Sequence, residues 1–164
     1  MLRSTLLFAL ILQLADAIGY DQSAAVTGTL MCNGRPATNV KVKMYDDDTG
    51  PDLDDFMAEG VTDGQGRFSL RGTTDEMMTI DPKINIYHDC NDGITASFPH
   101  SDQTNFRALF CVFFMIPCQR RTTIFVPSSY VSSGKNPTKM YNTGVIELAG
   151  QFQGEERDCV NKQR

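Results

Sequence analysis

The chain has 164 residues, which suits one domain, and its formal net charge is −5. An acidic chain lacks the basic face that phosphate binding requires, so nucleic acid is excluded as the expected partner. The same charge argues against simple electrostatic adhesion to anionic lipid.

The first 17 residues have the three parts of a secretory signal peptide. Arg3 supplies a positive charge, residues 6–12 (LLFALIL) form an apolar run, and Ala15-Asp16-Ala17 places small residues two apart before the expected cleavage point. The apolar run is shorter than the about 20 residues that a membrane-spanning helix needs. The sequence therefore predicts a signal peptide over residues 1–17, secretion to the extracellular region and no transmembrane segment.

The rest of the chain is expected to form one β-domain over residues 22–160. Strands are predicted at residues 25–32, 40–45, 56–62, 67–70, 82–88, 121–126 and 143–148. The clearest is VKVKMY, in which Val40, Val42 and Met44 alternate with polar residues. Tight turns are predicted at Asn33-Gly34 and at 63–66, and a short helical turn at 73–76. Short strands at this spacing are typical of an all-β sandwich.

Several segments, read in order, resemble the transthyretin-like family of secreted nematode proteins. The matching pieces are VTGTLMCNGRPATNVKVKMYDDD (26–48), TDGQGRFSLRGTTDE (62–76), IDPKINIYHDCNDG (80–93), PCQRRTTIFVPSSYV (117–131) and YNTGVIEL (141–148). The resemblance implies an immunoglobulin-like sandwich of seven or eight strands. It also implies a secreted protein that binds something outside the cell. Some relatives are thought to recognise lipid or cell-surface molecules, including phosphatidylserine on dying cells.

One stretch departs from the family pattern. Residues 94–115 form an apolar insert between two strands that relatives join by a few residues. Two interpretations stay open: a real loop, or an intron read as coding sequence, since long structureless loops are uncommon in compact domains. A native peptide that joins Asp92 directly to Pro117 would establish the second.

The five cysteines are Cys32, Cys90, Cys111, Cys118 and Cys159. Cysteines of a secreted protein are expected to pair, and five leaves one over. Cys90 ends one predicted strand and Cys118 begins the next, so an antiparallel pair would place them together, leaving Cys32 for Cys159. We therefore predict two disulfides and a free Cys111, although spacing alone leaves other pairings open.

The acidic loop at 46–55 is a candidate calcium site, because Ca²⁺ prefers several oxygen ligands. The candidate ligands are Asp46, Asp48, Asp52 and Asp54. The order of acids does not match an EF-hand, and a solvated loop is the alternative. No cofactor is predicted.

Arg120 and Arg121 are candidate ligand-binding residues, since arginine binds phosphate through two hydrogen bonds. In a strand only one of them can face a given side. His88 is a further candidate, with a packing role as its alternative.

No nucleophile–base pair or phosphate-binding loop is visible, so no enzyme activity is predicted. Transthyretin folds also host hydroxyisourate hydrolases, but those end in a Tyr-Arg-Gly-Ser tail that this chain lacks. We predict an extracellular recognition protein whose partner is a cell-surface protein or a lipid. A small-heterocycle hydrolase and a structural or antigenic protein without a ligand are the alternatives. The oligomeric state stays open.

Overall fold

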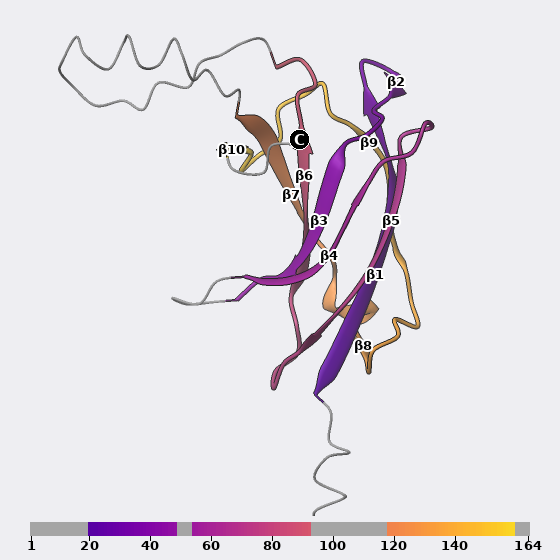
Figure 1. The fold of residues 1–164 in the computed structure, drawn as a ribbon, viewed down its shortest axis with the longest axis vertical. Coiled ribbons are helices and arrows are strands. Elements are labelled where there is room, and N and C mark those ends of the chain that lie inside the picture. The colour runs from indigo at the N-terminus through magenta and orange to yellow at the C-terminus, as the bar shows by residue number, and fades with distance from the viewer. Residues whose placement is uncertain (1–19, 49–53, 93–117, 160–164) are drawn as a thin grey trace, which may run out of the picture.

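Two β-sheets face each other (Figure 1). Buried apolar side chains form the core of the sandwich. The computed structural model describes residues 20–48, 54–92 and 118–159. Its strands are β1 (Asp21–Cys32), β2 (Arg35–Pro36), β3 (Lys41–Asp46), β4 (Asp55–Val61), β5 (Arg67–Asp75), β6 (Pro82–His88), β7 (Gln119–Phe125), β8 (Ser132–Ser133), β9 (Tyr141–Glu147) and β10 (Glu156–Asp158). A short 3₁₀ helix, η1 (Ser128–Tyr130), follows β7. The expected signal peptide, the insert 94–115, Cys111 and Asp52 lie outside the described residues.

The first sheet is built around β1, the longest strand. β5 pairs with β1 antiparallel, β9 pairs with it in parallel, and the two-residue strands β2 and β8 pair with it antiparallel. The second sheet has the order β10-β7-β6-β3-β4, with every neighbouring pair antiparallel. The predicted immunoglobulin-like, all-β sandwich is therefore confirmed.

Apolar side chains that alternate with polar ones along the strands fill the core. In β3, Val42 and Met44 are fully buried, whereas Lys41, Lys43 and Tyr45 are only partly so. The central strand β6 is buried along its whole length, as expected for a strand flanked by β3 and β7. Among the described residues, no helix has the length and apolar character to cross a membrane.

The turn between β4 and β5 shows why this sequence folds back here. The amide of Gly66 donates to the Asp63 carbonyl at 2.9 Å, and the Asp63 carboxylate accepts from the amides of Gln65 and Arg67, each at 2.8 Å. Gly66 has φ +74°, and an added Cβ would lie 2.3 Å from the carbonyl oxygen of Leu30. The predicted turn at 63–66 is confirmed.

Each of the seven predicted strands is present, the one at 82–88 with the predicted bounds and the others with shifted ends. One expectation fails, and three short strands, β10 among them, are additional to the prediction. The helical turn predicted at 73–76 is wrong, because β5 continues to Asp75, where Thr73 and Thr74 pair with Ser23 and Gln22 of β1. The strand β10 was not predicted. Its three residues are mostly exposed and carry no apolar alternation.

The missed strand explains why the predicted disulfide pairing is wrong. The four predicted cysteines do form two disulfides, but these join Cys32 to Cys90 and Cys118 to Cys159. The last pair of β10 and β7 is Asp158 with Gln119, so the next step places Cys159 opposite Cys118. The ladder between β6 and β7 ends at His88, and Cys90 is buried against Cys32, the last residue of β1.

Candidate functional site

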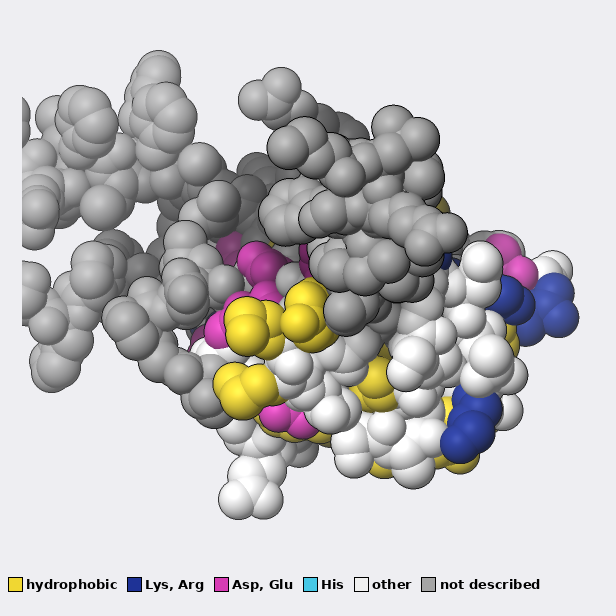
Figure 2. Space-filling model, turned by 90° about the horizontal axis from the view of Figure 1, so that it is seen from below, with side chains coloured by type: hydrophobic (Ala, Val, Ile, Leu, Met, Phe, Trp, Pro, Cys, Tyr) yellow, Lys and Arg dark blue, Asp and Glu magenta, His cyan; other side chains and the backbone are white. Residues whose placement is uncertain are grey.

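Exposed methionines project from the connection between β5 and β6. Met77 and Met78 are 82% and 80% exposed, and nearby Tyr20 is 50% exposed. The carbonyl of Tyr20 accepts a hydrogen bond from the amide of Glu76 at 3.3 Å. We call Tyr20, Met77 and Met78 the apolar tip. Figure 2, which views the end of the sandwich where β1 begins, shows apolar side chains next to acidic ones.

The side chain of Gln22 in β1 braces this tip. Its amide nitrogen donates to the carbonyls of Glu76 and Met78, and its oxygen accepts from the amide of Ile80 at 3.3 Å. Ile80 is itself 2% exposed and packs in the core. The connection is therefore fixed at both ends while its two methionine side chains face solvent. Exposed apolar side chains beside polar ones are candidates for contact with a partner or a lipid interface.

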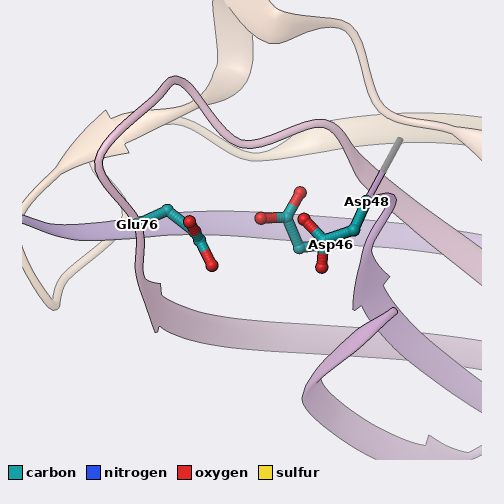
Figure 3. Close-up of side chains that lie close together, drawn as sticks. All are labelled: Asp46, Asp48 and Glu76. Atoms are coloured by element: carbon teal, nitrogen blue, oxygen red, sulfur yellow. The ribbon is translucent and has the colours of Figure 1, made fainter. Parts of the chain in front are cut away.

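Three carboxylates lie beside the tip. Asp46 ends β3, Asp48 follows it, and Glu76 follows β5, with one oxygen of each within 4.8 Å of the others (Figure 3). They line a hollow together with Asp47, Met78, Thr79 and Asp81. The pairing of Asp46 with Pro82 brings the end of β3 beside the start of β6, so the chain just before β6 reaches the acidic loop.

The environment of Asp46 and of Glu76 disfavours the charged forms of these two carboxylates. Burial raises the pKa of Asp46, with Asp48 and Asp81 adding to the shift, against the lowering effect of the Asp81 amide that donates to it at 2.7 Å. Desolvation and the neighbouring Asp48 and Asp46 raise the pKa of Glu76. A bound cation or added protons would relieve this crowding of negative charge.

The structure therefore brings together only part of the predicted calcium ligands. Asp46 and Asp48 lie in the cluster, whereas the carboxylate of Asp54 forms an ion pair with Lys83 at 2.8 Å. Lys83 also pairs with Asp47. Glu76 is the member that the sequence analysis missed, because nothing in the local pattern joins it to a loop 28 residues earlier.

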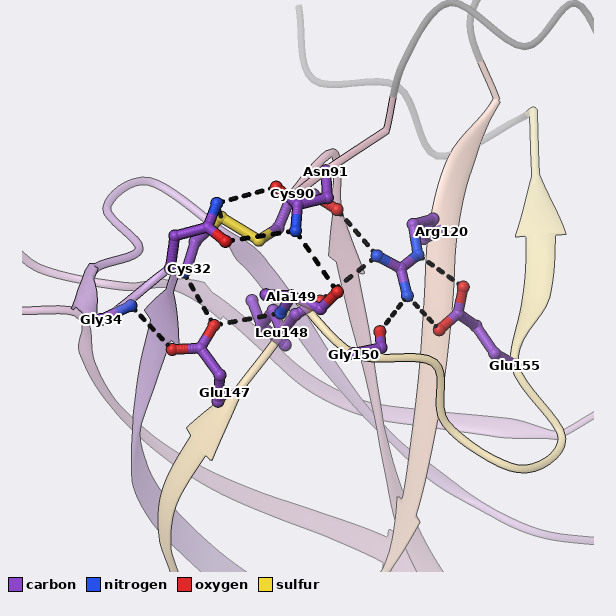
Figure 4. Close-up of a disulfide and its surroundings, with 11 residues drawn as sticks. Cys32, Gly34, Cys90, Asn91, Arg120, Glu147, Leu148, Ala149, Gly150 and Glu155 are labelled. Carbon is purple, nitrogen blue, oxygen red and sulfur yellow. Dashed lines mark hydrogen bonds and ion pairs between the residues drawn. A yellow bond between two sulfur atoms is a disulfide. The ribbon is translucent and has the colours of Figure 1, made fainter.

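Arg120 lies at a buried junction rather than on a surface. It is 5% exposed, and its guanidinium donates to the carbonyls of Cys90 (2.7 Å), Leu148 (3.3 Å) and Gly150, and to both oxygens of Glu155 (2.5 and 2.7 Å). Figure 4 shows these contacts beside the Cys32–Cys90 disulfide. We call this arrangement the Arg120 latch. It fixes the turn after β6 and the connection from β9 to β10 onto β7.

Of the other two predicted binding residues, Arg121 is paired with carboxylates and His88 is buried. Arg121 faces the opposite side of β7 from Arg120, as the alternation predicts, and pairs there with Glu156 and with Asp158 at 3.9 Å. His88 is 2% exposed and lies opposite Arg120 in the β6–β7 register. Neither Arg120 nor His88 has the access that a ligand-binding role requires.

Comparison with known proteins identifies the family of this chain. Residues 27–127 match the family described as the transthyretin-like family. This chain belongs to that family. Transthyretin-like protein 33 of Caenorhabditis elegans is 50% identical over 143 residues, covering 87% of this chain and 85% of that protein. Transthyretin-like protein 5 of the same organism is 50% identical over 144 residues, with 88% of each chain covered. The resemblance inferred from the sequence is confirmed.

Two solved structures show a distant likeness to this transthyretin-like chain. A 9R-lipoxygenase from Cyanothece has 18% identity and a TM-score of 0.40 over 77% of this chain and 16% of its own. An (S)-allantoin synthase has 17% identity and a TM-score of 0.39 over 85% of this chain and 45% of its own. Neither likeness bears on the activity of this protein.

Proposed function

We propose that this transthyretin-like protein is a secreted recognition module that binds a lipid surface outside the cell, with its apolar tip entering the interface. The observation that carries the proposal is the exposure of Met77 and Met78 on a connection braced by Gln22. Methionine side chains adapt to irregular apolar surroundings, and burying them in a lipid interface is favourable. Two disulfides support secretion, because disulfides persist in oxidising compartments.

The charge beside the tip determines which lipids and conditions should favour binding. Asp46, Asp48 and Glu76 would repel an anionic surface such as one containing phosphatidylserine. A divalent cation held by carboxylate oxygens would cancel that repulsion and could also bind a lipid headgroup. The calcium site thus stays a prediction, with Glu76 now joining Asp46 and Asp48 as an expected ligand.

Removing the apolar tip is expected to weaken lipid binding by about 30-fold, since each buried methionine contributes on the order of 1 kcal/mol at an interface. The variant Met77→Ser/Met78→Ser is compared with the wild-type, disulfide-bonded protein by co-sedimentation with vesicles. The vesicles contain phosphatidylcholine alone or with phosphatidylserine, with and without Ca²⁺. The matched control is Val145→Ser, which alters a 72% exposed side chain on β9.

Equal partitioning of the tip variant and the wild-type protein would refute binding through the tip. Absence of binding by the wild-type protein in every condition would favour a cell-surface protein partner instead. Glu76→Gln tests the cation separately: it should abolish any Ca²⁺ dependence, whereas Glu59→Gln, an exposed residue of β4, should preserve it. Ca²⁺ dependence that survives Glu76→Gln would exclude the carboxylate cluster as its source.

A further inference from the structure

His88 is a buried titratable group without a hydrogen-bond partner. It ends β6 and is 2% exposed. Within the described part of the chain, neither its Nδ1 nor its Nε2 has a hydrogen-bond partner. A neutral imidazole tolerates such a place better than a charged one, because burial penalises charge. The residue opposite it in the β6–β7 register is Arg120, which is permanently charged.

The groups around His88 come from three segments. Arg120 faces it from β7, Glu155 from the connection between β9 and β10, and Asp89 and Asp92 from the turn after β6. The carboxylates already have cationic or polar partners: Glu155 pairs with Arg120, Asp92 with Arg157, and Asp89 accepts from Gln119 at 3.1 Å. The three carboxylates favour a protonated ring through their charge, but none of them accepts a hydrogen bond from the imidazole of His88.

We propose that His88 makes the Arg120 latch sensitive to acid: protonation of its imidazole opens the Arg120 contacts and frees residues 148–158 from β7. The Cys118–Cys159 disulfide would keep the freed segment attached at its far end. The segment is a strap between the two sheets, because β9 pairs with β1 and β10 pairs with β7. The latch is the point at which this strap is fixed, through the carbonyls of Leu148 and Gly150 and the carboxylate of Glu155.

The direction of the pH effect follows from the two states of the latch. Burial, and then the charge of Arg120, lower the pKa of His88 from 6.5 to about 4 in the closed state, while Glu155, Asp89 and Asp92 oppose the shift. An opened latch exposes the ring and restores its ordinary value. The closed state is therefore fully favoured above pH 6.5 and loses its advantage as the pH falls toward 4. Between pH 7 and pH 4.5 the opening equilibrium should rise by about 50-fold.

Hydrogen–deuterium exchange of the full-length, disulfide-bonded protein tests this proposal. Rates are measured at pH 7 and pH 4.5 and corrected for the intrinsic pH dependence of amide exchange. Peptides covering residues 149–158 should lose protection by about 50-fold relative to peptides from β1 and β5. The variant His88→Leu should show no such loss. Retained protection in the wild-type protein, or an equal loss in His88→Leu, would overturn the proposal.

A second variant and a direct titration keep the test decisive if His88→Leu does not fold. Thr122→Val is the matched control, because Thr122 is buried beside β6, also lacks a hydrogen-bond partner for its hydroxyl, and does not titrate. It should retain the acid-induced opening. NMR titration of the His88 ring in the wild-type protein should give a midpoint well below 6.5, coincident with the loss of protection at 149–158. A midpoint near 6.5 with unchanged protection would contradict the latch.

Discussion

Replacement of Arg120 by methionine is expected to lower the free energy of unfolding by about 3–5 kcal/mol. The change leaves the Glu155 carboxylate, whose pKa Arg120 lowers, without its cation. It also removes the donors to the buried carbonyls of Cys90 and Leu148 and to the partly buried carbonyl of Gly150. An unpaired buried charge and unsatisfied carbonyls are each costly. Guanidinium unfolding curves of wild-type and variant protein measure the loss.

The neighbouring residue provides the control for this prediction. Arg121→Met removes an arginine from the same strand, but its partners Glu156 and Asp158 lie on the outer side of the sheet and Glu156 is mostly exposed. Partly exposed ion pairs contribute little, so the expected loss is about 1 kcal/mol or less. Similar losses in the free energy of unfolding for both variants would show that the buried contacts of Arg120 stabilise the fold no more than the partly exposed ion pairs of Arg121 do. Arg120→Lys should fall between them, because lysine keeps the charge but not the planar fork.

Removal of the Cys32–Cys90 disulfide is expected to cost about 4 kcal/mol at most, from the entropy of closing a loop of this length. The two cysteines are 58 residues apart, and their bond joins β1 of one sheet to the turn after β6 of the other. The double variant Cys32→Ala/Cys90→Ala should unfold at a correspondingly lower guanidinium concentration. The loss is comparable with the whole stability of a small domain.

Thiol labelling of a single variant tests the pairing itself. In Cys90→Ala, the released thiol should be at Cys32, and the peptide carrying Cys118 should remain linked to the one carrying Cys159. Release of a thiol at Cys118 would instead indicate the pairing that the sequence suggested. Peptide mapping without reduction distinguishes these outcomes independently of any change in stability.

The strands were predictable where one face of the sheet is buried, because alternation then appears in the sequence, as in Val40, Val42 and Met44. The exception at Thr73 and Thr74 is instructive. These residues stay extended because β1 pairs with them, and no local pattern reports a partner strand 51 residues away. The polar strand β10 also has no recognisable pattern in the sequence. Without it, the pairing of Cys118 with Cys159 could not be predicted.

Only part of the candidate site was predictable from the sequence. The acidic loop draws attention to Asp46 and Asp48, but the fold also brings Glu76, the residue after β5, beside them, and Asp54 pairs with Lys83 instead. The sequence offers Arg120 and His88 as candidate ligand-binding residues because of their residue types, with a packing role as the alternative for His88. Their parity along β6 and β7 places them inward, where one becomes a fixed cation and the other an uncharged ring.

The order of the two disulfides along the chain divides the protein into two covalent units. One ring closes between Cys32 and Cys90 and the second between Cys118 and Cys159, so the rings follow one another and neither encloses the other. Backbone cleavage between Asp92 and Cys118 would therefore yield two fragments joined by non-covalent contacts alone: strand pairing, core packing and side-chain contacts such as those of Arg120. A change in the length of that connecting stretch leaves the size of both rings unaltered, so the family fold can accept insertions there without a penalty in ring closure.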